Sequence, residues 1–129
     1  MRNPFEEIIE SYFADVFENY ALEKKISEYS PEHFGDALVT YMSPTFDIRF
    51  IKDRSQIFVE FSSPGANNWF DLIEIMRAIT LKEESGTIAS YKYFEDDVEP
   101  QRETNQINHL AIALKPYWQK IAFYFKNKK

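Results

Sequence analysis

The stretch FDIRFIKDRSQIFVEF, residues 46–61, constrains the fold more than any other part of the sequence. Apolar and polar residues alternate on both sides of the polar tetrapeptide KDRS, as in two half-buried strands joined by a hairpin loop. An antiparallel pair of this kind buries one face and leaves the other exposed. The fold must therefore supply elements that cover a single side of a sheet. The apolar positions of the two strands are Phe46, Ile48, Phe50, Ile57, Val59 and Phe61.

Two further segments are expected to extend this sheet. ALVTYM (37–42) is rich in strand-forming residues and precedes the hairpin, and SGTIASYKYF (85–94) follows it. Ahead of these strands, SPEHFGD (30–36) predicts a short capped turn that begins at Ser30 and stops at Gly35. We therefore expect an antiparallel sheet of about four strands.

An amphipathic helix is expected at the start of the chain, over about residues 4–25. Its apolar residues recur at the i, i+3, i+4 spacing of one helix face. Asn3 can cap this helix and Pro4 suits its first position. Lys24 and Lys25 then lie near its far end, where they would complement the helix dipole.

Two helices are expected in the second half of the chain. WFDLIEIMRAITL (69–81) places apolar residues at helical spacing, although a buried strand is the alternative. The segment from about 103 to 126 carries a second apolar stripe that Pro116 interrupts. This last helix either kinks at the proline or stops near Leu114 and restarts, and both arrangements keep the stripe continuous.

The chain as a whole is expected to form one α+β domain spanning residues 1–129, with the N-terminal and C-terminal helices packed on one face of the sheet. It contains no cysteine, which excludes disulfides and thiolate metal sites and favours a reducing compartment. The start MRNPFEEIIE is unlike a signal peptide because acids interrupt it. No apolar run is long enough to cross a bilayer. We expect a cytoplasmic protein without membrane contact.

Charge is distributed unevenly along the chain. The net charge is −6; residues 1–36 carry 3 basic and 9 acidic side chains, residues 83–100 carry 1 and 6, and residues 101–129 carry 6 and 1. An acidic chain does not favour nucleic acid as a ligand, because phosphate binding needs clustered lysines and arginines. A basic protein partner is the better expectation, since complementary fields steer association.

The most acidic short segment is YKYFEDDVEP, residues 91–100. It lacks the spaced acids and the glycine of a calcium loop, so no metal or other cofactor is expected there. A solvated acidic turn and a surface that faces a partner both remain open. The two tyrosines favour a surface that faces a partner, because tyrosine beside charge is common among interface anchors. The predicted partner-binding residues are Tyr91, Tyr93, Glu95, Asp96, Asp97 and Glu99.

Two alternatives of other classes stand beside this interpretation. A small enzyme could use His33 or His109 as a general base with a carboxylate, although no serine lies in a nucleophile elbow. An oligomerising module could use Tyr117 and Tyr124, which fall off the apolar stripe of the last segment and could form a homodimer contact.

Three segments carry a resemblance to a known group of proteins. They are the hairpin FDIRFIKDRSQIFVEF (46–61), the apolar WFDLIEIM (69–76) and the ending HLAIALKPYWQKIAFYF (109–125), which differs by placing a proline at Pro116. Together the chain over 37–126 resembles small bacterial α+β proteins similar to the immunity proteins of polymorphic-toxin systems. This resemblance implies a non-catalytic protein that binds a cognate toxin domain, and it assigns no role to any single residue.

Overall fold

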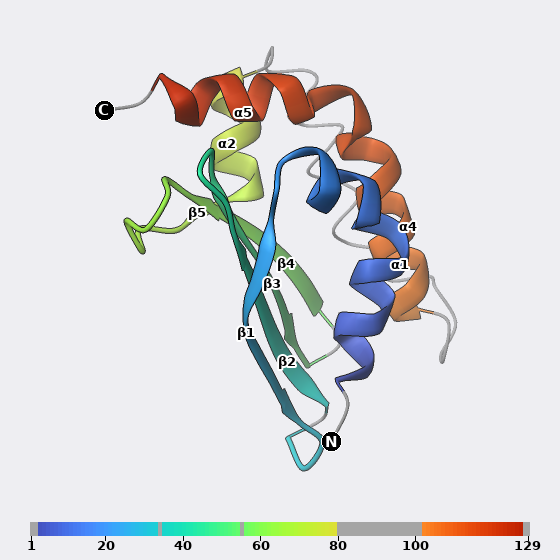
Figure 1. Cartoon of the computed structure of the whole chain (residues 1–129). Helices are drawn as coiled ribbons and strands as arrows, with labels where there is room; N and C mark the ends of the chain where they lie inside the picture. Colours follow the sequence, from blue (N-terminus) through green and yellow to red (C-terminus); the bar gives the residue numbers. More distant parts are fainter. Residues whose placement is uncertain (1–2, 34, 55, 80–101, 128–129) are drawn as a thin grey trace.

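The computed structural model describes residues 3–33, 35–54, 56–79 and 102–127. Within these residues the chain forms a five-stranded antiparallel sheet in the order β1-β2-β3-β4-β5. Helices lie at both ends of the chain, and Figure 1 shows α1, α4 and α5 on one side of the sheet. The α+β class is therefore confirmed, with five strands in place of about four. The elements are α1 (Pro4–Asn19), β1 (Glu23–Ser30), β2 (Asp36–Met42), β3 (Asp47–Asp53), β4 (Gln56–Ser62), β5 (Phe70–Asp71), α2 (Leu72–Ile79), α4 (Arg102–Leu114), the 3₁₀ turn η1 (Lys115–Tyr117) and α5 (Trp118–Lys126).

The predicted hairpin forms the centre of the sheet. Phe50 pairs with Val59 and Ile48 with Phe61 across β3 and β4, and all four side chains are buried on the same face. The backbone of Arg54 in the hairpin loop donates to the Asp36 carboxylate at 2.9 Å. The alternation in the sequence therefore identifies both the strands and their inward face.

The first helix ends earlier than its apolar pattern predicts. Asn3 caps α1 by accepting backbone hydrogen bonds from Phe5 and Glu6, but the helix stops at Asn19. The N–H of Leu22 then donates to the carbonyl of Phe17 at 2.8 Å, and Ala21 adopts a left-handed φ of 55°. A left-handed residue past the last turn is a common way to end a helix.

The residues expected at the end of that helix form strand β1 instead. Lys24 and Lys25 belong to an antiparallel pair in which β1 runs beside β2, with an irregular register between Lys24 and Ile26. The first six residues of β1 are exposed, so the strand has no buried face that would produce an alternating pattern. Residues Pro31 to Gly35 connect β1 to β2, and Gly35 has the left-handed φ of 72° expected at the end of the predicted turn.

The second half agrees with prediction in outline. The segment expected as a helix over 69–81 begins as the short strand β5 and continues as α2. The last helix stops at Leu114, passes through η1 with Pro116 near its start, and resumes as α5. Leu110, Leu114, Trp118, Ile121 and Phe125 are nevertheless all buried, so the apolar stripe continues through the interruption. The strand predicted over 85–94 lies outside the described residues.

Aromatic rings fill the space between the helices and the sheet. Phe13 of α1 contacts Phe50 edge-on, with ring centres 5.0 Å apart, and Trp118 of α5 stacks on Phe46 at 6.1 Å. Phe61 and Phe125 stack at 6.3 Å, which joins β4 to α5. Because these contacts link both terminal helices to the central strands, one core holds the described elements together.

Candidate protein-binding surfaces

The predicted partner-binding residues lie in a part of the chain that the structure does not describe. Tyr91, Tyr93, Glu95, Asp96, Asp97 and Glu99 are all outside the described residues. Their role as a contact surface therefore stays a prediction, and the candidate surfaces below are built from the described residues alone.

Helix α1 presents an acidic outer face. Its acidic residues are Glu6, Glu7, Glu10, Asp15 and Glu18, and it contains no lysine or arginine. Glu7, Asp15 and Glu18 are exposed and fall on the side of the helix opposite its buried residues. A run of like charge on one helix face repels anions and attracts cationic surfaces.

Two of the α1 acids hold the helix against the sheet. Glu6 accepts an ion-pairing hydrogen bond of 2.6 Å from Lys24 of β1, and this bond raises the pKa of the Lys24 ammonium. Glu10 accepts a hydrogen bond of 3.1 Å from the hydroxyl of Tyr41. Burial, and after it the nearby negative charge of Glu10, raises the pKa of Tyr41. These two acids serve packing, whereas Asp15 and Glu18 point to solvent.

A groove of about 650 Å³ runs between α1 and the α4–η1 segment, next to the acidic face. Its walls include Tyr12 and Asp15 from α1 and Ile112 and Lys115 from the opposite side. Tyr12 is 39% exposed and Ile112 is 63% exposed. Exposed aromatic and aliphatic side chains beside charge are typical of protein contact surfaces.

The basic end of the chain does not neutralise this acidic face. Lys115 lines the groove but forms no ion pair with Asp15, and Lys120 and Lys126 likewise pair with no carboxylate of the described residues. These three lysines therefore form no direct ion pair with the described acids of α1. The described ion pair of the last segment joins Lys52 to Glu103 at 2.8 Å.

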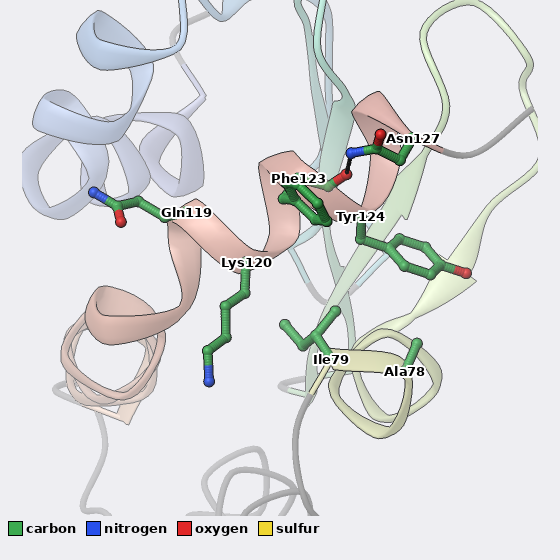
Figure 2. Close-up of a pocket in the computed structure, with 7 residues that line it drawn as sticks. All are labelled: Ala78, Ile79, Gln119, Lys120, Phe123, Tyr124 and Asn127. Atoms are coloured by element: carbon green, nitrogen blue, oxygen red, sulfur yellow. Dashed lines mark hydrogen bonds between the residues drawn. The ribbon is translucent and has the colours of Figure 1, made fainter.

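A second hollow lies between α2 and α5 and also measures about 650 Å³. Figure 2 shows the Ile79 side chain of α2 facing Phe123 and Tyr124 of α5, with Lys120 extending beside them. The Phe123 ring is 68% exposed, the largest exposure among the large apolar side chains of the described residues. The remaining lining residues are Ala78, Gln119 and Asn127, and the Asn127 amide donates to the carbonyl of Phe123 at 2.9 Å.

Lys120 is the single charged residue among the described residues that line this hollow. Its ammonium lies 5.7 Å from the centre of the Tyr117 ring, within range of a cation–π contact. The sequence pointed to Tyr117 and Tyr124, which fall off the apolar stripe of the last segment. It gave no reason to single out Phe123 or Ile79, because the hollow arises only where α2 and α5 meet.

The histidines and the polar core give no further candidate. His33 is exposed in the β1–β2 turn, where its backbone N–H donates to the carbonyl of Ser30, and His109 lies half-buried on α4. In the described part of the chain no three or more histidine, aspartate or glutamate side chains gather as a metal site would require. The buried Asp47 accepts from the backbone N–H of Gly65 at 2.9 Å, so it anchors the loop after β4.

Among the described residues, no helix combines the length and the apolar character needed to cross a membrane. No family model, curated protein or solved structure matches this chain.

Proposed function

We propose that the chain is a non-catalytic protein-binding domain that acts as an immunity protein, neutralising a cognate bacterial toxin domain in the cytoplasm. The resemblance in the sequence suggests this class, and the outer surface of α1 supplies a surface suited to it. The partner is a basic protein, and neither nucleic acid nor a membrane takes part.

The observation that supports this proposal best is the position of the acidic face next to the groove. Asp15 belongs to both, since it is exposed on α1 and lines the groove beside Tyr12. A partner seated here would bury the Tyr12 ring and the Ile112 side chain while its lysines or arginines face Asp15 and Glu18. Apolar anchors supply affinity in such contacts, and complementary charge supplies the association rate.

A toxin that acts on nucleic acid or another polyanion carries a basic active surface. An acidic protein can occupy such a surface in place of the substrate, without any chemistry of its own. The predicted residues Glu95, Asp96, Asp97 and Glu99 would add to the negative charge that such a partner meets.

The experiment measures association of the chain with the basic C-terminal domain of the toxin encoded beside it. We expect the association rate to fall by about tenfold or more between low and high salt, since steered association depends steeply on ionic strength. Replacing Asp15 and Glu18 by lysine should slow association, and replacing Tyr12 by alanine should speed dissociation.

The matched control is Asp53→Lys, which makes the same charge change as either single substitution, Asp15→Lys or Glu18→Lys, at an exposed residue of the β3–β4 hairpin. A second variant replaces Glu95, Asp96, Asp97 and Glu99 by their amides. It measures how much of the association rate depends on the predicted acidic segment. An association rate that does not change with salt, or an equal loss in the Asp53 control, would contradict the proposed surface.

A further inference from the structure

The hollow between α2 and α5 is chemically unlike the groove between α1 and the α4–η1 segment. Its walls are the aliphatic side chains of Ala78 and Ile79 and the rings of Phe123 and Tyr124 (Figure 2). A volume of about 650 Å³ lies within the range of small-molecule sites, roughly 300–1,000 Å³. Such sites are mostly apolar with a few polar groups that fix orientation, and this description fits the hollow.

The charge of the hollow indicates what kind of ligand it would take. Lys120 lines it, and none of the other described lining residues is acidic. Lys24, Lys25 and Lys52 each pair with a glutamate, whereas the described partner of the Lys120 ammonium is the ring of Tyr117. Among the described residues, therefore, no carboxylate pairs with this cation, which can attract an anionic ligand.

We propose that the hollow binds a small amphipathic anion, an alkyl chain that carries one carboxylate. The alkyl chain lies against Ile79, Phe123 and Tyr124 and covers the exposed Phe123 ring. The carboxylate pairs with the Lys120 ammonium. The proposed toxin contact uses α1 and the groove instead, and Gln119 is the described residue that lines both.

The form of the hollow favours such a ligand over a polypeptide segment. Its apolar walls end within one turn of Lys120, since Phe123 and Tyr124 follow that lysine by three and four positions on α5. A small ligand with an anionic group at one end of an apolar chain can therefore contact the lysine and these two rings at the same time. The groove beside α1, in contrast, is lined by both Asp15 and Lys115 and extends along two helices, so it suits a larger partner.

The test is a calorimetric titration of the full chain with decanoate, below its micelle concentration, and with the uncharged 1-decanol. We expect saturable 1:1 binding of decanoate. Lys120→Gln should weaken decanoate binding by about fivefold, the upper part of the range for an exposed ion pair, and should leave decanol binding unchanged. Phe123→Ala should weaken both ligands, and the exposure of that ring lets the variant fold.

The control is Lys126→Gln, an exposed lysine of the same helix that does not line the hollow. An equal loss in Lys120→Gln and Lys126→Gln would show general charge attraction and would overturn the proposal. The absence of saturable binding, or decanoate affinity that survives Phe123→Ala, would overturn it as well. Dimerisation that buries Phe123 and blocks decanoate, seen by sedimentation, would assign the hollow to a second copy and would also reject the ligand.

Discussion

The hydroxyl of Tyr41 donates a hydrogen bond of 3.1 Å to the carboxylate of Glu10, which joins strand β2 to the middle of helix α1. Tyr41 is 2% exposed, and its ring stacks on Phe17 of the same helix with centres 4.1 Å apart. Tyr41 therefore contributes both a hydrogen bond and an aromatic contact. The substitution Tyr41→Phe removes the hydrogen bond and keeps the ring.

The first prediction concerns alkaline pH. Burial and the charge of Glu10 raise the pKa of Tyr41 above its unfolded value of about 10. Below about pH 10 the Tyr41 hydroxyl is protonated in both the folded and the unfolded chain, and the full stability is present. Above that pH the unfolded chain loses this proton while the folded chain keeps it, so the unfolding free energy falls as the pH rises. Between pH 9 and pH 11 the wild type should lose about 1 kcal/mol more unfolding free energy than Tyr41→Phe. Urea unfolding at each pH measures this difference. A wild type and a Tyr41→Phe variant with parallel pH profiles would contradict it.

The second prediction compares two phenylalanines of opposite environment. Phe50 is fully buried among the rings of Phe13, Phe17 and Tyr41, so Phe50→Ala should lower the unfolding free energy by about 3–5 kcal/mol. Phe123→Ala should change it by about 0.5 kcal/mol or less, since surface substitutions have small effects. Chemical denaturation of both variants provides the measurement. Similar losses in the two would contradict the described core.

The third prediction concerns the end of α1. Ala21 adopts a left-handed φ of 55°, which costs a residue with a Cβ roughly 1–2 kcal/mol but costs glycine little. Ala21→Gly should therefore raise the melting temperature, with a net gain of about 0.5 kcal/mol after the greater entropy of glycine in the unfolded chain. Ala21→Val should lower it. A loss of stability in the glycine variant would show that the helix ends in another way.

The fourth prediction concerns the loop after β4. Asp47 is buried and accepts the backbone N–H of Gly65 at 2.9 Å. Asp47→Ala should lower the unfolding free energy by about 1–3 kcal/mol, because the Gly65 donor loses its partner. The exchange of the Gly65 amide with deuterium should also become faster. Unchanged protection of that amide would mean that the loop does not depend on Asp47.

The hairpin over 46–61 could be predicted because each of its strands buries only one face. Ile48 and Phe50 face the helices while Arg49 faces away, so the pattern in the sequence repeats the geometry of the sheet. The same reasoning failed for β1, whose exposed residues carry no alternation. There the apolar residues of α1 run on through Tyr20 and Leu22, and nothing in their spacing shows that Ala21 reverses the chain.

The surfaces were harder to predict than the elements. The acidity of α1 is visible in the sequence, since Glu7, Asp15 and Glu18 share one helix face. The hollow is not visible there, because Ile79 and Phe123 come from helices that are distant in sequence and meet only in the folded chain. Sequence periodicity describes one element at a time, whereas a concave site depends on how two elements cross.

Strand β1 bears on how any partner must recognise this protein. It forms one edge of the sheet, carries the exposed charges of Glu23, Lys24, Lys25 and Glu28, and changes register between Lys24 and Ile26. Charged and irregular edges hinder the docking of an additional strand. A partner is therefore hindered from adding a strand to β1 through main-chain hydrogen bonds, which would be the least selective way to bind. Discrimination then falls to side chains, where a few substitutions can redirect the protein from one partner to another.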